Sequence, residues 1–299
     1  MLEIEPDSRY GDVLEREVFN GILSGIALDG KSFFYVNPLE VIPEACKKDE
    51  RKMHIKSVRQ KWFGCACCPP NLARLVASIG TYAYTTDEDT LFVHLYMGSE
   101  FSHKDLSIRT ESSFPDSGKV KISAQTSGKS DAVLALRIPS WCNDKYDFKA
   151  DRELSQEYKD GYLYLKGFED DTVIEIDFDM TSRIVVPDSK VREDLGRAAL
   201  VRGPVVYCME EKDDGKDLAS LYIDATKEIR EEETMEFGLP VTALIVSGYR
   251  KESSSRNDYV TPLYKGFEAI VKEEKEIRFI PYRLWANRGE GEMSVYINI

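Results

Sequence analysis

Trp62-Phe63-Gly64-Cys65-Ala66-Cys67-Cys68-Pro69-Pro70-Asn71 is the stretch around which this 299-residue chain is organised. It holds three of the six cysteines of the sequence. Cys67 and Cys68 pair poorly with each other, because a disulfide between neighbours strains the peptide that joins them. Three thiols this close together favour a soft metal site or thiolate chemistry over the plainer alternative of buried structural thiols.

A helix is expected directly after the cysteines. The Pro69-Pro70 pair suits the first turn, where a missing N–H costs nothing. Apolar residues then recur at helical spacing and predict a stripe that faces a core: Leu72, Leu75, Val76 and Ile79. Cys67 and Cys68 therefore precede a helix N-terminus, whose positive dipole end favours a thiolate. A zinc ion on the same sulfur would deprotonate it outright.

Composition bounds the class of protein. Apolar residues make up 42% of the chain and aromatic residues 11%, which indicates a globular protein. The net charge of −13 argues against nucleic acid and against an anionic membrane as partners. No apolar run resembles a signal peptide or reaches transmembrane length. The remaining cysteines, Cys46, Cys142 and Cys208, are scattered singly, and we therefore expect a reducing, cytoplasmic location.

The first part of the chain has helical periodicity. Apolar residues repeat every fourth position from Tyr10, which predicts a helix that ends at Ser24 or Gly25. Spacing alone places Glu15 on a solvated face of this helix. Phe33-Phe34-Tyr35-Val36 is aromatic and β-branched and predicts a short buried strand. The polar segment 46–61 is expected to be a loop or an irregular helix.

Beyond residue 82 the period changes to two. Alternation and apolar runs predict strands at 90–96, 120–124, 132–138, 174–180, 184–187, 199–208, 241–246, 267–271, 277–280 and 293–299. The charged stretch 228–236 is expected to be a solvated loop or short helix. We predict an α+β multidomain chain with a helical region at 1–82, an antiparallel β-sandwich domain at 83–185 and a second antiparallel β-sandwich-type domain at 186–299.

Four runs of residues in this order resemble glycoside hydrolase family 127, the β-L-arabinofuranosidase family with a cysteine nucleophile. They are Phe33 to Glu40, Trp62 to Asn71, Arg202 to Cys208, and Ile280-Pro281-Tyr282 through Gly291-Glu292-Met293. The resemblance covers essentially the whole chain. It implies an (α/α)6 barrel followed by β-sandwich domains, with the helices of 1–82 as the last helices of that barrel.

The resemblance also implies roles for single residues. Cys67 corresponds to the nucleophile of a retaining, two-step hydrolysis, and Cys67 and Cys68 correspond to zinc ligands. Glu15 resembles a pocket glutamate and Tyr35 a pocket-lining tyrosine, so both are implied to bind substrate. The implied substrate is an oligosaccharide or glycoconjugate that contains L-arabinofuranoside. A homo-oligomer is left open.

One departure from the family concerns the barrel. In the family, the acid/base glutamate and a Glu-x-Cys pair of zinc ligands lie upstream of the helix that begins this chain. We therefore expect a C-terminal portion with an incomplete zinc site, weakly active or inactive alone. Local residues that could complete a four-ligand shell instead are Cys65, Cys46, His54, Glu40 and Glu44.

The alternative hypothesis is a β-sandwich carbohydrate-binding or scaffold module with a structural zinc site. Trp141, Tyr282 and Trp285 would then present a face on which sugars stack, although single aromatic residues in strands are more often part of a core. Thiol redox activity is weaker still. Cys65-Ala66-Cys67 lacks the Cys-x-x-Cys spacing, and the chain has no βαβ pattern.

Overall fold

The computed structural model describes residues 1–65, 67–253, 259–261, 264–265 and 270–299. The chain is a strand-rich α+β protein, as its periodicity predicts. It forms two compact units, one of Met1–Ile22 with Ala66–Thr181 and one of Leu23–Cys65 with Ser182–Ile299. The predicted helical region 1–82 thus contributes to both units, and the domain boundaries at 82 and 185 stay predictions.

The chain begins with a continuous helical segment that ends where the sequence predicts, at Ser24. Helix α1 (Ser8–Arg16) is capped by Asp7, whose Oδ1 accepts a hydrogen bond from the backbone N–H of Arg9 at 2.9 Å. It continues through a π-helical segment, η1 (Glu17–Ile22), and the helical conformation ends at Ser24. Helix α3 (Cys68–Ala77) follows the cysteines, and a short α4 (Gly80–Ala83) leads into the strands. No described helix is long and apolar enough to cross a membrane.

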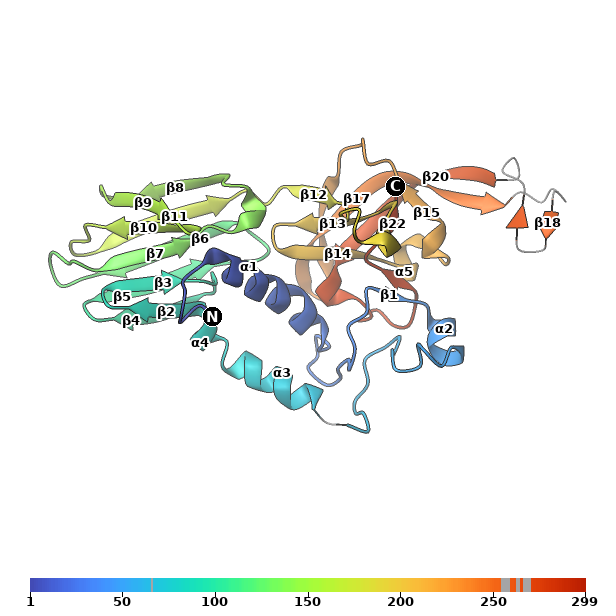
Figure 1. Cartoon of the computed structure of the whole chain (residues 1–299), viewed down its shortest axis with the longest axis horizontal. Helices are drawn as coiled ribbons and strands as arrows, with labels where there is room; N and C mark the ends of the chain where they lie inside the picture. Colours follow the sequence, from blue (N-terminus) through green and yellow to red (C-terminus); the bar gives the residue numbers. More distant parts are fainter. Residues whose placement is uncertain (66, 254–258, 262–263, 266–269) are drawn as a thin grey trace. The chain divides into compact units, whose positions relative to one another are not determined.

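Two five-stranded sheets complete this unit (Figure 1). The first has the order β2 (Tyr84–Asp87), β3 (Thr90–Val93), β7 (Val133–Arg137), β10 (Tyr162–Lys166), β9 (Ser155–Lys159). The second has the order β4 (Ser99–His103), β5 (Leu106–Ser112), β6 (Lys119–Gln125), β11 (Thr172–Phe178), β8 (Tyr146–Ala150). The sheets are not wholly antiparallel, since β3 and β7 run parallel. That pair becomes possible because the chain visits the other sheet between them, which gives the long connection that parallel strands need.

One apolar core lies between these sheets. Inward residues of both contribute to a single cluster, among them Leu91 and Leu134 of the first sheet and Ile122 and Ile174 of the second. Each of these four side chains is fully buried, at 0% exposed. Strand β11 shows how the pattern specifies this, because its odd and even positions alternate between the core and the outer face.

The second unit has one large sheet instead of the predicted sandwich-type pair. Its strands are β1 (Glu40–Val41), β12 (Ser182–Val185), β13 (Arg197–Arg202), β14 (Val205–Glu210), β15 (Leu221–Ile223), β16 (Arg230–Glu236), β17 (Leu239–Ser253), β20 (Ile270–Pro281), β21 (Met293–Ser294) and β22 (Ile297–Asn298). The pairings β14–β20–β17–β15–β22–β13 close on themselves, because β13 also pairs with β14. Apolar side chains from these six strands form one buried cluster. The ring therefore encloses its own core.

The smaller elements of this unit lie outside that ring. They are α2 (Pro43–Lys48), α5 (Glu211–Asp214) and a two-stranded sheet of β18 (Tyr259–Thr261) and β19 (Tyr264–Lys265). The strand predicted at 267–271 falls largely outside the described residues.

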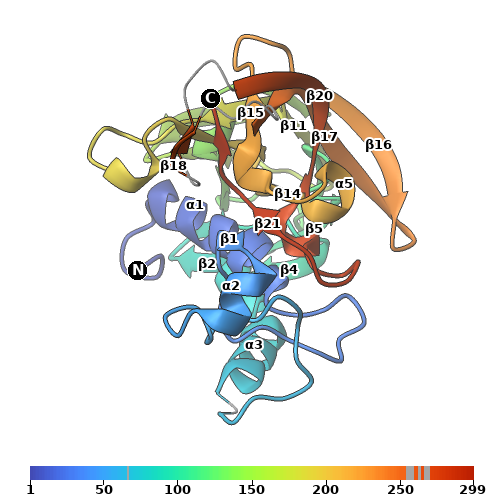
Figure 2. The same ribbon diagram turned by 90° about the vertical axis from the view of Figure 1, so that its right-hand side faces the viewer.

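Two local predictions are wrong. The segment 33–36 is not a strand, because only Phe33 makes ladder contacts, as single bridges to Ile26 and Gln60. The charged segment 228–236 is not a loop, because β16 pairs along its whole length with β17 (Figure 2). Its seven residues are exposed or half-buried. Such a charged outer strand is typical of a protected sheet edge.

Candidate active site

The cysteines lie where the sequence predicts, at the start of α3. Cys67 is the N-cap residue and Cys68 the first helical residue, and their Sγ atoms are 3.7 Å apart. Cys67 is exposed and Cys68 half-buried. The carbonyl of Cys67 accepts a hydrogen bond from Nδ2 of Asn71 at 2.9 Å, which fixes the first turn. A ten-residue helix thus begins beside an accessible sulfur, and the positive end of a helix dipole favours negative charge at such a position.

The same two sulfurs fit part of a zinc site. Two thiolates on one tetrahedral zinc, each at about 2.3 Å, lie about 3.8 Å apart, close to the separation seen here. No third His, Cys, Asp or Glu joins them in a metal-binding group within the part of the chain that the structure describes. Completion of the shell by Cys46, Cys65, His54, Glu40 or Glu44 stays a prediction. Cys46 itself is buried in the apolar core of the second unit.

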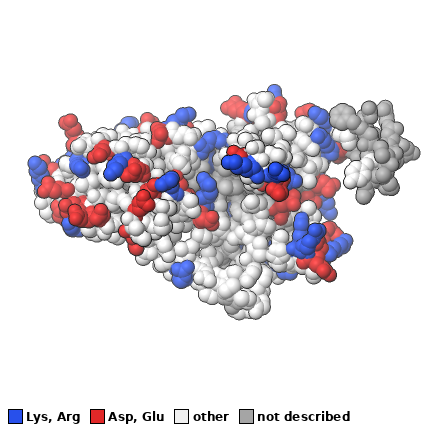
Figure 3. All heavy atoms as spheres, viewed as in Figure 1, with Lys and Arg blue, Asp and Glu red and all other residues white. Residues whose placement is uncertain are grey.

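Helix α3 differs from the prediction in one respect. Its apolar stripe was expected to face a core, yet none of its residues is buried, and Val76 is 54% exposed. Only Ile79, beyond the end of the helix, packs against the core between the sheets. The molecular surface at α3 is mostly uncharged in Figure 3. The prediction fails because, within the described residues of the first unit, α3 buries none of its side chains.

Glu15 lies in the opposite environment from the one that spacing predicts. It is fully buried, and its carboxylate accepts hydrogen bonds from Nη2 of Arg137 and, at 2.6 Å, from Nε1 of Trp141. Arg137 is buried as well, and its Nη1 donates to Asp12 at 2.6 Å. Burial raises the pKa of Glu15, while Arg137 and Trp141 oppose that shift. Both oxygens of Glu15 are engaged, so its implied contact with substrate stays a prediction.

A buried histidine extends this polar network. The carbonyl of His94 accepts a hydrogen bond from Nε of Arg137 at 2.6 Å. The imidazole shares hydrogen bonds of 2.7 Å with the hydroxyls of Thr85 and Tyr162. Burial, and secondarily the charge of Arg137, lowers the pKa of His94 to about 4. The ring is therefore neutral at physiological pH and joins the two hydroxyls as a structural element.

Tyr35 belongs to an aromatic segment of the second unit. It is 44% exposed, and its ring contacts that of Phe63 at 5.7 Å. Its neighbour Phe34 stacks on Trp285 with ring centroids 4.4 Å apart. Tyr35 is thus partly accessible, as its implied substrate contact requires. That contact stays a prediction.

Arg59 holds this aromatic segment in place. Its guanidinium lies over the ring of Phe34 at 4.6 Å and donates to the carbonyl oxygens of Ser24 and Trp285, at 2.8 and 2.7 Å for its two Nη atoms. Burial lowers the pKa of Arg59 to about 10, so the group remains charged at neutral pH. Gln60 and Phe33 exchange two backbone hydrogen bonds of 2.9 Å next to it. The segments 33–35 and 59–63 are thereby tied together.

Two of the three aromatic residues proposed for sugar stacking are not on a surface, and the third, Trp141, is half-buried. Trp285 and Tyr282 are 1% and 3% exposed and belong to the core of the second unit. Trp141 packs against Phe114 and Phe178 and donates to Glu15. The sequence reasoning missed Arg59, His94 and Arg137, whose partners are distant in the chain. A single signal was available for Arg137, a charged residue at the end of the apolar run 132–138.

Comparison with known families covers almost the whole chain. Residues 1–81 match the β-L-arabinofuranosidase catalytic domain of glycoside hydrolase family 127, residues 90–180 match the middle domain of the same family, and residues 182–298 match its C-terminal domain. The chain belongs to glycoside hydrolase family 127. The resemblance expected from the four sequence runs is thereby confirmed.

Relatives within family 127 are similar over about half of their length. A non-reducing end β-L-arabinofuranosidase of Bifidobacterium longum is 36% identical across 99% of this chain and 46% of its own. The crystal structure of a family 127 β-L-arabinofuranosidase from Geobacillus stearothermophilus T6 superposes with a TM-score of 0.91 at 40% identity, over 100% of this chain and 47% of that one. A further family 127 β-arabinofuranosidase structure gives a TM-score of 0.80 at 30% identity, over 99% and 46%.

Proposed function

We propose that this chain is the C-terminal portion of a retaining glycoside hydrolase that acts on β-L-arabinofuranosides, with Cys67 as its nucleophile. One observation carries the proposal. An accessible Cys67 lies at the N-terminus of α3 with its sulfur 3.7 Å from that of Cys68. The helix dipole stabilises the thiolate there, and the thiolate is the nucleophilic form of cysteine.

The reaction follows the two-step logic of retaining enzymes. Sγ of Cys67 bonds to the anomeric carbon while the glycosidic C–O bond breaks, and the leaving oxygen takes a proton from a general acid. Water then attacks the anomeric carbon, the C–S bond breaks, and the thiolate is restored as the water proton passes to the same group.

Zinc, when bound, would keep the sulfurs deprotonated, and Cys67 and Cys68 would hold it. Cys67 and Cys68 would supply two of its usual four ligands. We further propose that α1 and α3 are the last helices of an (α/α)6 barrel and that the two five-stranded sheets form a β-sandwich domain. On this account the chain alone hydrolyses weakly or not at all.

Hydrolysis of 4-nitrophenyl β-L-arabinofuranoside tests the proposal. The chain should be compared with a version extended upstream by the preceding coding sequence, and each with its Cys67→Ser variant. We expect activity in the extended protein, loss of that activity on Cys67→Ser, and little activity in the chain itself. Full activity of the Cys67→Ser variant would overturn the proposed nucleophile. Zinc content of the same samples, lost on Cys67→Ser, checks the metal ligands separately.

The alternative, a carbohydrate-binding module that stacks sugars on Trp141, Tyr282 and Trp285, is disfavoured. Tyr282 and Trp285 are buried in a core, and the half-buried Trp141 packs against the core between the sheets.

A further inference from the structure

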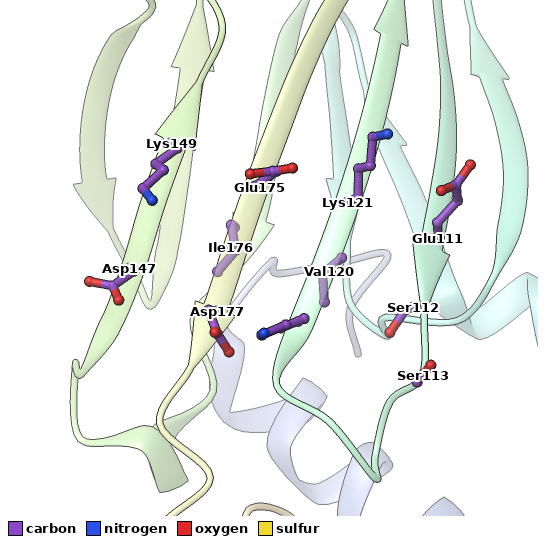
Figure 4. Close-up of a pocket in the computed structure, with 11 residues that line it drawn as sticks. Glu111, Ser112, Ser113, Val120, Lys121, Asp147, Lys149, Glu175, Ile176 and Asp177 are labelled. Atoms are coloured by element: carbon purple, nitrogen blue, oxygen red, sulfur yellow. The ribbon is translucent and has the colours of Figure 1, made fainter.

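The outer face of the second sheet of the first unit is hollowed. A cavity of ≈ 600 Å³ lies over strands β5, β6, β11 and β8, on the side of the sheet away from the core (Figure 4). Its floor is the first part of β6 and the last part of β11, where Val120 and Ile176 turn their side chains into the core. Its walls are charged side chains that project outward from all four strands.

These charges alternate in sign across the strands. In register, Lys149 of β8 stands opposite Glu175 of β11, Glu175 opposite Lys121 of β6, and Lys121 opposite Glu111 of β5. Figure 4 shows these four side chains as one row across the cavity. Glu175 therefore has an ammonium group on each side, and Lys121 has a carboxylate on each side.

A second row does not alternate. Asp177 stands opposite Lys119 on one side and opposite Asp147 on the other. Like charges directly opposite each other destabilise a sheet. Among the described residues, no ion pair within 4.0 Å joins the charged side chains of either row. The second row is thus not explained by cross-strand pairing.

We propose that this cavity is an accessory binding site for a neutral oligosaccharide. A sugar hydroxyl both donates and accepts hydrogen bonds, so it can donate to Glu175 or Asp177 and accept from Lys121 or Lys149. An anionic ligand would meet the carboxylates, and a cationic ligand would meet the lysines. A neutral polyol satisfies both signs, and the volume lies within the roughly 300–1,000 Å³ typical of ligand sites. The choice of arabinofuranosyl sugars rests on the function proposed above.

Chemical-shift titration of the ¹⁵N-labelled chain with a β-L-arabinofuranosyl oligosaccharide tests this site. We expect saturable shifts confined to β5, β6, β8 and β11. Glu175→Gln and Lys121→Gln should each weaken binding roughly tenfold, the effect of losing one charge-assisted hydrogen bond. Glu157→Gln is the matched control, because this exposed carboxylate lies on β9 of the other sheet, and it should leave binding unchanged.

Other outcomes have defined meanings. Absence of saturable shifts on these strands, or equal weakening by Glu157→Gln, would overturn the site. Binding of spermidine or inorganic phosphate there in place of the sugar would overturn the ligand class. Cys67→Ser should leave binding at this cavity intact, and binding lost in that variant would mean that the sugar occupies the candidate active site instead. The chain could still bind the sugar at this cavity while its extended form fails to hydrolyse the arabinofuranoside. That result would contradict the proposed function and leave the accessory site standing.

Discussion

Helices α1 and α3 of the same unit differ in what they bury. Helix α1 buries the charged side chain of Glu15, whereas helix α3 leaves its apolar side chains at least partly exposed. On α1, Asp12 and Glu15 lie three residues apart and hold one guanidinium, that of Arg137. The side chains of Glu15 and Arg137 are at most 1% exposed. On α3 no side chain is buried, and two cysteine sulfurs lie 3.7 Å apart at its N-terminus.

This contrast separates what holds the fold from what does chemistry. A buried charge is tolerated only when it is paired and hydrogen-bonded, so the α1 network contributes to the fold through its completeness. A nucleophile needs the reverse, an accessible atom with negative charge stabilised beside it. We therefore expect substitutions along α1 to act on stability and those at the start of α3 to act on reactivity.

Arg137→Met should have the largest effect. It removes the only charge partner that the structure gives to buried Glu15 and leaves the carboxylate uncompensated, which costs about 3–5 kcal/mol. Urea unfolding measures the loss. Arg109→Met is the control, because its ion pair with Glu100 at 3.5 Å is solvent-exposed and contributes less than about 1 kcal/mol. Equal losses of unfolding free energy in the two variants would show that the buried ion pair stabilises the fold no more than an exposed one.

The free energy of unfolding should also decrease when the pH is lowered, because of His94. Its pKa is about 4 in the folded chain, below its ordinary value of 6.5, so the unfolded chain binds more protons between these limits. Its contribution is complete above pH 6.5 and is lost as the pH falls toward 4, by roughly 3 kcal/mol in total. Denaturation of the wild type and of His94→Gln at each pH isolates this term. If the free energy of unfolding of His94→Gln decreases with falling pH as steeply as that of the wild type, the burial argument is contradicted.

Gly11→Ala should cost less. A Cβ at Gly11 would lie 2.5 Å from Cδ of Arg137, so α1 or the guanidinium must shift, at about 1–3 kcal/mol. Thermal unfolding of Gly80→Ala gives the comparison, because a Cβ there meets nothing within 4 Å. That control should be neutral or stabilising by up to about 1 kcal/mol. A neutral Gly11→Ala would show that α1 packs more loosely on Arg137 than the structure indicates.

The smallest effect is expected on α3. Val76→Ala removes methyl groups that are already half in solvent, and the change should be within about 0.5 kcal/mol. Val18→Ala, in the helical segment that continues α1, removes the same atoms from a buried site and should cost about 2 kcal/mol. A loss at Val76 as large as that at Val18 would mean that the face of α3 is covered in solution.

The sequence predicts most of what depends on local pattern. The strand at 174–180 follows from strict alternation, and the start of α3 follows from the proline pair after the cysteines. The strand at 230–236 escapes prediction because an exposed edge strand lacks an apolar face, and its pairing with β17 is visible only in the fold. Hydrophobic periodicity predicts which residues share one face of a helix or strand, but it does not predict which part of the fold packs against that face.

The site shows the same limit more sharply. The place of Cys67 and Cys68 at a helix start could be predicted from their neighbours, because a proline pair follows them. The burial of Glu15 could not, since its partner Arg137 lies 122 residues further along the chain. Arg59 is similar, with one acceptor at Trp285, 226 residues away. Buried charges of this kind are specified by long-range pairing, which no window of sequence contains.

Alkylation of the metal-free chain with iodoacetamide, followed by peptide mass spectrometry across a range of pH, tests the thiolate at position 67 most directly. Cys65 is the internal reference, because it is an exposed thiol of the same chain. The account predicts that Cys67 reacts faster than Cys65 at neutral pH and keeps its reactivity to lower pH. Equal rates with the same pH dependence at the two positions would contradict it.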